Sequence, residues 1–274
     1  MAGRIGHLRE PGNERNESLL RWHGSKRLLA PTIVKLFPAG YEKMVYVEPF
    51  CGSAAVFWAK RPSKVEVLND LNEELVNFLM TVKLHSRELA RALRLLPNSR
   101  ALFAQALDCS NCQSSGRVNP FESSILRAGR FVYLSHISFG GLREHWAPEG
   151  RHGKPPHIHN LKKRFYRWAL RLARAYLECS PWQEVIDKHD SAQALFYVDP
   201  PYLGTQGYQN PFGESDWREL RGRLEMIKGK FLLSAGGTAR MKLLWRGFHE
   251  RLTAITSSLG PNDRRQKELL VWNY

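Results

Sequence analysis

One tetrapeptide in this chain has the residue types for a specific reaction. Asp-Pro-Pro-Tyr, residues 199–202, directly follows an apolar run, residues 194–198, that predicts a buried β-strand. The prolines cannot continue a sheet ladder and fix φ at about −65°, so the chain is stiff just past the strand. Asp199 and the Pro200 carbonyl accept hydrogen bonds, and Tyr202 offers a flat face.

These groups suit an exocyclic amino group on a flat ring. Asp199 and the carbonyl of Pro200 accept its two protons while Tyr202 stacks on the ring, so the nitrogen lone pair stays free to attack an electrophile. A strand end followed by a proline turn is the plain alternative for these residues taken alone.

A second candidate site follows the first predicted strand, residues 44–47. The turn 48–54 contains Gly52 and Ser53 and precedes a predicted helix, residues 55–60. Small residues there let a ligand approach the backbone beside the positive helix N-terminus. The turn is neither a G-x-G-x-x-G fingerprint nor a P-loop, so we interpret it as another kind of nucleotide or cofactor turn.

Asp70 closes the next predicted strand, residues 64–68. A carboxylate in that place suits both hydroxyls of a ribose, although an N-cap for the helix 73–84 is the alternative. Earlier in the chain, Trp22 and Lys26 precede a helical pattern at 28–37, where they can cover a ligand and reach its charge. That segment alone fits a helix start equally well.

The composition favours a polyanionic partner. The chain has 274 residues, of which 41 are Lys or Arg and 26 are Asp or Glu, for a net charge of +15. Nucleic acid is the first candidate, and a generally basic protein is the alternative. No apolar run is long enough for a membrane helix and the polar N-terminus lacks a signal-peptide core, so we expect a cytoplasmic protein without a membrane partner.

The cysteines do not predict a metal site. Of the four, only Cys109 and Cys112 have C-x-x-C spacing, and no second pair completes a zinc site. We interpret them as reduced thiols in a polar loop, residues 108–119, and expect no metal.

The middle of the chain changes character twice. Residues 87–135 are helical in pattern apart from that loop, and residues 136–160 form an aperiodic stretch rich in Gly, His, Pro and basic residues. A basic helix follows, most of whose cations can share a face toward DNA phosphates or toward solvent. They are Lys162, Lys163, Arg164, Arg167, Arg171 and Arg174.

The two ends of the chain complete the pattern. Residues 1–17 are polar and without periodicity, which predicts a loose arm. After the tetrapeptide we expect a loop over 204–213, a helix over 215–227, and strands over 231–234, 252–257 and 269–273.

Several of these segments, in this order, resemble the Dam-like family of adenine-specific DNA methyltransferases. The similarity runs from about residue 20 to the C-terminus, and a series of short matches in the family's order is more specific than any one of them. The matches are Arg-Trp-His-Gly-Ser-Lys at 21–26, Glu-Pro-Phe-Cys-Gly at 48–52, Asn-Asp-Leu-Asn at 69–72, Arg-Phe-Val-Tyr-Leu at 130–134, Phe-Gly-Gly-Leu-Arg at 139–143, Asp-Pro-Pro-Tyr at 199–202 and Glu-Leu-Leu-Val-Trp-Asn-Tyr at 268–274.

The resemblance implies an α/β fold, with a Rossmann-like methyltransferase domain and a mainly helical and loop target-recognition insertion. We predict a catalytic domain over 18–86 and 177–274 and a DNA-binding insertion over 87–176, after the arm 1–17. The implied methyl donor is S-adenosylmethionine, and the implied acceptor is the N6 amino group of adenine in duplex DNA. The adenine leaves the helix and receives the methyl group by direct in-line displacement, without a metal.

The resemblance also implies roles for individual residues. Asp199, Pro200 and Tyr202 act on the adenine. The expected cofactor contacts are Trp22, Lys26, Glu48, Phe50, Gly52, Ser53, Asp70 and Asp199. Arg143 is expected to contact a base, and Lys162, Lys163 and Arg167 the DNA backbone.

The sequence departs from the family at two places. Ala54 replaces the usual second glycine of the cofactor turn, and residues 152–158 replace a Phe-Asn-Val-Pro-Phe-Gly-like stretch, so the resemblance does not predict a GATC target. A cytosine N4 amine, an RNA adenine and a non-catalytic DNA-binding role stay open. The recognition sequence, a cognate restriction endonuclease, a phage or host role and the oligomeric state also stay open.

Overall fold

The computed structural model describes residues 20, 22, 24–94, 96–114, 123–138, 143, 145–146, 162–202, 212–256 and 265–274. The predicted arm 1–17, most of the stretch 136–160 and nearly all of the loop 204–213 lie outside these residues. The side chains of Cys112, Lys162 and Lys163 lie outside them as well.

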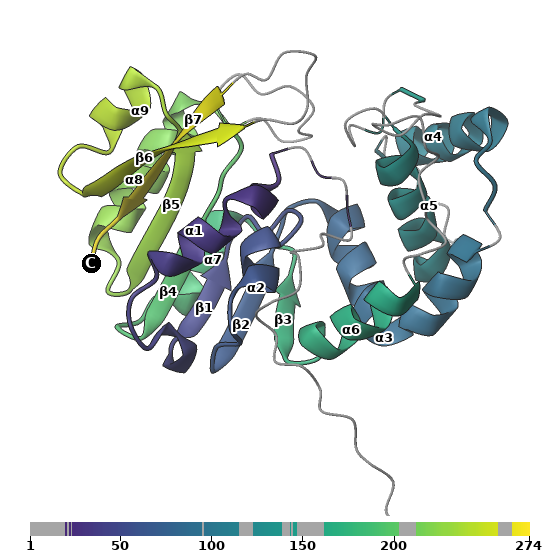
Figure 1. Cartoon of the computed structure of the whole chain (residues 1–274), viewed down its shortest axis with the longest axis horizontal. Helices are drawn as coiled ribbons and strands as arrows, with labels where there is room; N and C mark the ends of the chain where they lie inside the picture. Colours follow the sequence, from purple (N-terminus) through teal and green to yellow (C-terminus); the bar gives the residue numbers. More distant parts are fainter. Residues whose placement is uncertain are drawn as a thin grey trace, which may run out of the picture.

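A mixed sheet forms the centre of the described part of the chain (Figure 1). Its seven strands run in the order β3-β2-β1-β4-β5-β7-β6. The first five strands are mutually parallel, and β7 pairs antiparallel with both β5 and β6. The strands are β1 (Val45–Glu48), β2 (Val65–Asn69), β3 (Ala175–Glu178), β4 (Ala194–Val198), β5 (Lys230–Gly236), β6 (His249–Thr256) and β7 (Arg265–Trp272).

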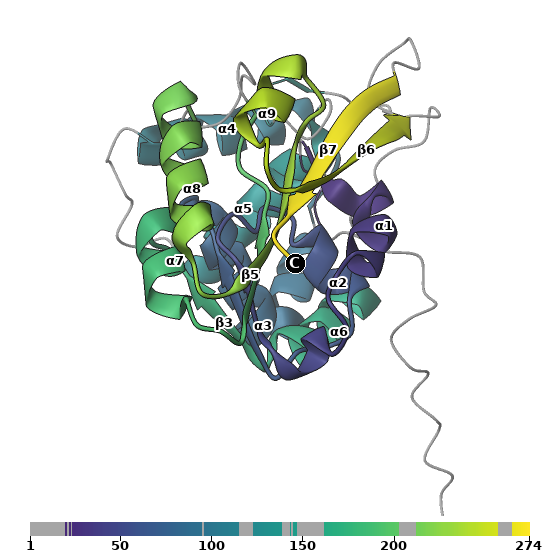
Figure 2. The same ribbon diagram turned by 90° about the vertical axis from the view of Figure 1, so that its left-hand side faces the viewer.

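Helices cover both faces of this sheet, as the edge view of Figure 2 shows. In the central strand β4, Leu195 and Tyr197 enter one hydrophobic core while Phe196 and Val198 enter the other. Strands buried on both faces are continuous apolar runs, which is why the run at residues 194–198 predicts a core strand. One face is covered by α1 (Ala30–Lys35) and α2 (Ala55–Ala59), and the other by α7 (Trp182–His189), α8 (Glu214–Met226) and α9 (Ala239–Leu244).

The remaining helices form a lobe beyond β3, on the right in Figure 1. They are α3 (Glu73–Arg94), α4 (Arg100–Ser114), α5 (Ser124–Ile137) and α6 (Lys162–Leu172), and α3 packs against both α5 and α6. The core of this lobe is continuous with the α1 and α2 side of the sheet. The predicted α/β Rossmann-like class is confirmed. The division at 86/87 and 176/177 stays a prediction. The first boundary lies next to a kink in α3 at His85, and the second falls inside β3.

Two expectations about local structure were wrong. Helix α4 continues to Ser114 where a polar loop over 108–119 was expected, so Cys109 lies exposed on a helix. Four short elements were not predicted, namely the 3-10 helix η2 (Tyr41–Lys43), β3, α7 and α9. Each has only three to eight residues, too few for a clear periodic pattern. None of the described helices is long and apolar enough to cross a bilayer.

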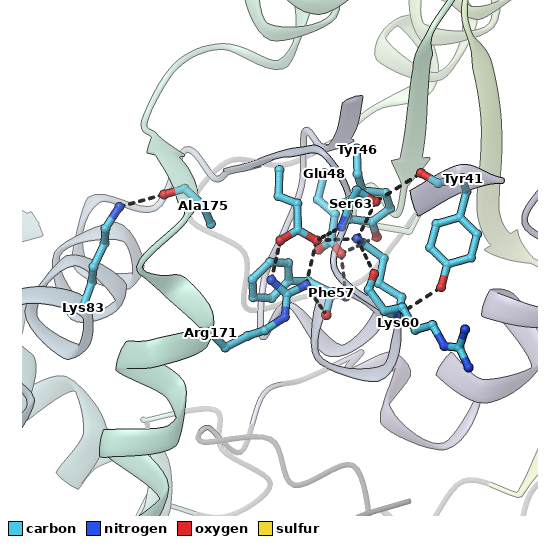
Figure 3. A network of polar contacts seen from close by, with 11 residues as sticks. Tyr41, Tyr46, Glu48, Phe57, Lys60, Ser63, Lys83, Arg171 and Ala175 are labelled. Carbon is cyan, nitrogen blue, oxygen red and sulfur yellow. Dashed lines mark hydrogen bonds and ion pairs between the residues drawn. The ribbon is translucent and has the colours of Figure 1, made fainter. Parts of the chain in front are cut away.

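A buried ionic network joins α6 to the sheet (Figure 3). Arg171 binds the carboxylate of Glu66 on β2 through both terminal nitrogens, and its guanidinium lies 3.7 Å from the ring centre of Phe57. Lys60 contacts the same carboxylate at 2.5 Å. The sequence predicts that most of the cations of this helix can share a face toward DNA or solvent. Arg171 is an exception, because Glu66 turns it inward.

Candidate active site

The predicted site residues meet at the carboxyl edge of the parallel strands. Strand β1 pairs with β2 on one side and with β4 on the other, in a register that brings Glu48, Asn69 and Val198 to the same edge. The strand order reverses between β1 and β4, and open α/β sheets bind ligands at such a switch point. The turn after β1, Asp70 after β2 and Asp199 after β4 therefore lie at one edge of the sheet.

The turn after β1 has an unusual backbone. Both Gly52 (φ 48°) and Ala54 (φ 51°) adopt the left-handed conformation, which only glycine adopts without strain. The Gly52 amide donates to Asp70 Oδ2 at 2.9 Å, while Asp70 Oδ1 accepts from the Asn72 amide at 3.0 Å. Asp70 thus braces the turn from the neighbouring strand.

The N-cap of α3 is Asn72 rather than Asp70. The Asn72 side chain accepts from the Leu75 amide at 3.0 Å, as an N-cap does. The alternative of Asp70 as helix cap therefore does not describe this structure. Burial raises the pKa of Asp70, against the two amides that bind its carboxylate. Its ribose role stays a prediction.

Trp22 lies against the same turn, and Arg143 lies over the Trp22 ring. A Cβ placed on Gly52 would lie 2.9 Å from Trp22 Nε1. The guanidinium of Arg143 lies 5.4 Å from the Trp22 ring centre and 4.7 Å from that of Phe131. Ser25 and Ser53 join the two segments through their hydroxyl oxygens, 2.8 Å apart.

Two other predicted cofactor residues have structural partners here. Glu48 is buried, and its Oε1 accepts from the Tyr46 hydroxyl at 2.6 Å and from the Phe57 amide of α2 at 2.9 Å (Figure 3). Burial raises the pKa of Glu48 to about 8, although the bond from Tyr46 opposes this. The ring of Phe50 packs edge-on against Phe212. Glu48 therefore joins the end of β1 to the start of α2.

Asp199 lies at the end of β4 beside a lysine. Its buried Oδ1 forms an ion pair with Lys26 Nζ at 2.8 Å. Lys26 itself donates to the Gly24 carbonyl at 3.0 Å and lies over the Tyr202 ring, 4.7 Å from its centre.

Sequence reasoning missed one member of this cluster, Glu268 on β7. The hydroxyl of Tyr202 donates to Glu268 Oε1, and the same oxygen lies 3.6 Å from Lys26 Nζ. Its signal was present, because Glu268 begins the C-terminal motif that carries the resemblance. No chemistry pointed to it, since a carboxylate on an edge-proximal strand usually faces water.

The charges of the cluster are coupled. Burial raises the pKa of Asp199 and Lys26 opposes that rise. Burial also raises the pKa of Glu268, to about 7, with Lys26 opposing and Asp199 adding to the rise. For Lys26, burial lowers the pKa, but the two carboxylates together raise it above its ordinary value. Lys26 is therefore a cation held between two carboxylates.

Only some of the predicted DNA contacts have described side chains. Arg143 has φ 62°, and its amide donates to Ser138 Oγ at 2.9 Å. Its guanidinium faces Trp22 and Phe131, as described above. Arg167 is exposed on α6, and Lys162 and Lys163 begin that helix. The base and phosphate roles of these residues stay predictions.

Comparison with known proteins agrees with this arrangement. The family described as "D12 class N6 adenine-specific DNA methyltransferase" matches residues 22–216, which include the turn after β1, Asp70 and the tetrapeptide 199–202. The chain belongs to this family. The predicted resemblance to adenine-specific DNA methyltransferases is thereby confirmed.

Curated relatives of this family member are DNA adenine methylases. The DNA adenine methylase of Escherichia coli K12 is 28% identical over 69% of this chain and 66% of its own length. That of Serratia marcescens is 27% identical over 76% of this chain and 77% of its own length. The DNA N-6-adenine-methyltransferase of Escherichia phage P1 is 28% identical over 78% of this chain, but the match covers only 28% of the phage protein. The chain therefore spans just under two thirds of the first of these relatives and a smaller part of the last.

Proposed function

We propose that this protein transfers a methyl group from S-adenosylmethionine to the N6 amino group of an adenine in a specific duplex DNA sequence. One observation carries the proposal. The Asp199 carboxylate and the Tyr202 ring lie around Lys26 Nζ, which is 2.8 Å from Asp199 Oδ1 and 4.7 Å from the ring centre, at the carboxyl end of β4. Open α/β sheets bind ligands at such a switch point. A carboxylate has about four lone-pair sites, so Asp199 can accept from the amino group of a bound base as well as from Lys26.

The residues after β1 and β2 fit the methyl donor. The left-handed backbone at Gly52 and Ala54 keeps the turn tight, so a ligand can approach it closely. Asp70 lies beside the turn, and its carboxylate keeps free lone pairs after it accepts hydrogen bonds from the Gly52 and Asn72 amides. Trp22 supplies an aromatic surface against the turn. When bound, S-adenosylmethionine supplies a methyl group on a positively charged sulfur, which the nearby carboxylates of Asp199 and Asp70 favour.

The protein's own part in the reaction is positioning and hydrogen bonding. The carboxylate of Asp199 and the carbonyl of Pro200 would accept the two amino protons of the adenine, which leaves the nitrogen lone pair free to attack. As the bond from nitrogen to the methyl carbon forms, the bond from that carbon to sulfur would break, and the sulfur would keep the electron pair as a neutral thioether. The nitrogen would gain positive charge, which the carboxylate of Asp199 stabilises in a buried site, and the amino group would then release one proton to solvent. Tyr202 holds the ring by stacking.

An adenine inside a duplex cannot reach the sheet edge where Asp199 lies, so the base leaves the helix at a cost of a few kcal/mol. The net charge of +15 attracts the phosphates of DNA without regard to sequence. Arg167 on α6 is suited to that contact, and Lys162 and Lys163 are suited to it by their position at the start of this helix.

The test is expression in a host without DNA methylation, followed by mapping of modified bases. Methyl groups on adenine N6 in one sequence context support the proposal. Purified protein with radiolabelled S-adenosylmethionine is then offered duplex DNA, single strands and RNA. Transfer mainly to cytosine N4 or to RNA would favour the alternative acceptors, and DNA binding without transfer would favour a non-catalytic role. The mapped sequence also permits a search for a restriction endonuclease that cuts the same site.

A further inference from the structure

Glu268 lies in the candidate site but outside residues 22–216, the segment matched by the family. It is on β7, opposite Gly236 of β5 and Thr253 of β6 in the register of the sheet, and its side chain is 5% exposed. A buried carboxylate is costly unless it is paired. The groups that pair with Glu268 are Tyr202 and Lys26.

One oxygen of Glu268 makes both contacts. Oε1 accepts from the Tyr202 hydroxyl and lies 3.6 Å from Lys26 Nζ. Lys26 in turn lies 2.8 Å from Asp199 Oδ1 and 4.7 Å from the centre of the Tyr202 ring. Glu268 therefore contacts Lys26, which pairs with Asp199, and Tyr202, whose ring Lys26 covers.

The charge of the cluster depends on Glu268. With Asp199 and Glu268 ionised and Lys26 protonated, the three groups carry a net charge of −1. Without the charge of Glu268, Lys26 would neutralise Asp199 and the net charge would be zero. Asp199 would stabilise the positive charge that develops on the substrate amine less strongly if Lys26 already neutralised its carboxylate.

We propose that Glu268 is a positioning residue for methyl transfer, which fixes the Tyr202 ring and shares Lys26 with Asp199 so that Asp199 keeps its negative charge toward the substrate amine. This inference rests on the proposed function. Glu268 does not touch the substrate in this scheme. It acts through Tyr202 and Lys26.

The inference predicts a dependence on pH. The titratable groups that face Glu268 are Lys26 from the segment before α1, and Asp199, Tyr197 and Tyr202 from β4 and the chain after it. Among the described residues, its β5 and β6 partners in register, Gly236 and Thr253, carry no charge. Burial raises the pKa of Glu268 to about 7. Because the ionised form is the active one, kcat/KM should rise as pH increases through about 7.

The decisive variant is Glu268→Gln, which still accepts from Tyr202 but carries no charge. Glu250→Gln is the matched control, since Glu250 is an exposed glutamate on the neighbouring strand β6. We expect E268Q to lose about 100-fold in kcat, the size of a lost positioning effect, with little change in DNA affinity. It should also lose the rise in kcat/KM near pH 7, which E250Q keeps. An E268Q enzyme with wild-type kcat and the wild-type pH profile would overturn the inference.

Two further measurements separate the possible causes of a negative result. If E268Q does not fold, Glu268→Asp keeps the charge on a shorter side chain. A lower rate that still rises near pH 7 would then support the inference, and a flat profile would overturn it. The second measurement needs no activity. In ¹³C NMR of glutamate carboxyl groups, one resonance should titrate near pH 7 in the wild type and be absent from E268Q. A wild-type protein that shows this resonance but methylates no DNA would refute the proposed function and leave the Glu268 cluster intact.

Discussion

The backbone of Gly52 lies against the indole of Trp22, so closely that a Cβ at position 52 would come within 2.9 Å of Nε1. These residues come from the segment before α1 and from the turn after β1. Their contact means that the walls of the candidate cofactor site are formed partly by a residue that precedes the whole sheet. Any side chain at position 52 must displace Trp22 or the turn.

Gly52→Ala should therefore impair both stability and cofactor binding. The new methyl group meets Trp22, and the left-handed φ of 48° adds strain of about 1–2 kcal/mol for a residue with a Cβ. Ala54→Gly is the matched control, because Ala54 already has φ 51° in the same turn. Ala54→Gly relieves backbone strain, but it also makes the unfolded chain more flexible and removes a methyl contact. We therefore expect the free energy of unfolding to change by at most about 1 kcal/mol. Urea unfolding and calorimetry with S-adenosylmethionine measure the two effects. Equal stability of both variants would show that the turn adapts freely.

The sequence predicted the part of the fold that repeats simple patterns. The strands β1, β2, β4 and β5 lie within one or two residues of their expected positions, because buried parallel strands are continuous apolar runs. The sequence failed where an element is short or polar. Helix α4 continues through Asp108–Ser114 although those residues are mostly polar. Packing against other helices can keep a polar segment helical, and a single sequence does not show where that happens.

Asp199→Asn should lose methyl transfer while DNA binding is retained. The amide keeps the shape of the side chain but has no negative charge to stabilise the amine, so we expect a decrease in kcat of about 10²–10³-fold. Asp199→Ala should be at least as impaired. Single-turnover assays give the rate, and fluorescence anisotropy with labelled duplex gives the affinity. Substantial turnover by either variant would refute the role of Asp199 as the amine acceptor.

Asp70→Ala should weaken cofactor binding, whereas Asn72→Ala should lower stability. Asp70 braces the turn at Gly52 and is the predicted ribose ligand, so its removal should weaken S-adenosylmethionine binding by roughly 1.5–3 kcal/mol, typical of hydrogen bonds to a charged group. Asn72 caps α3, so its removal should lower the free energy of unfolding by about 1 kcal/mol and leave cofactor affinity unchanged. Calorimetry and thermal unfolding of both variants measure this. A folded Asp70→Ala protein with wild-type affinity would remove Asp70 from the cofactor site.

The sequence identified site residues by their place after strands, and the structure brings Asp70, Asp199 and the Gly52 turn to one edge as that reasoning requires. It could not find Glu268, because the contact with Lys26 joins residues 242 positions apart through the antiparallel strand β7. It also could not foresee that Arg171 is held by Glu66, since a basic helix looks the same whether its cations meet solvent or a buried carboxylate. Both failures concern partners that only the tertiary fold supplies.

Arg143→Ala tests whether that residue reads a base. In this structure its guanidinium packs against Trp22 and Phe131, and burial lowers its pKa, with Glu74 and Asp70 opposing. To reach a guanine edge, the side chain must leave these rings when DNA binds. If it does, the variant should lose about 1–3 kcal/mol on the cognate site and relax preference at one base position.

Lys162→Ala is the comparison for Arg143→Ala, because a phosphate contact weakens all sequences alike and lowers the salt dependence by about one unit. Methylation of a randomised DNA library at two salt concentrations, with calorimetric cofactor affinities, separates the outcomes. A loss confined to one base position supports base readout by Arg143. A loss that is equal at every position and accompanied by weaker S-adenosylmethionine binding would mean that Arg143 stays on Trp22 and serves the cofactor side of the site, because Trp22 is the ring that lies against Gly52.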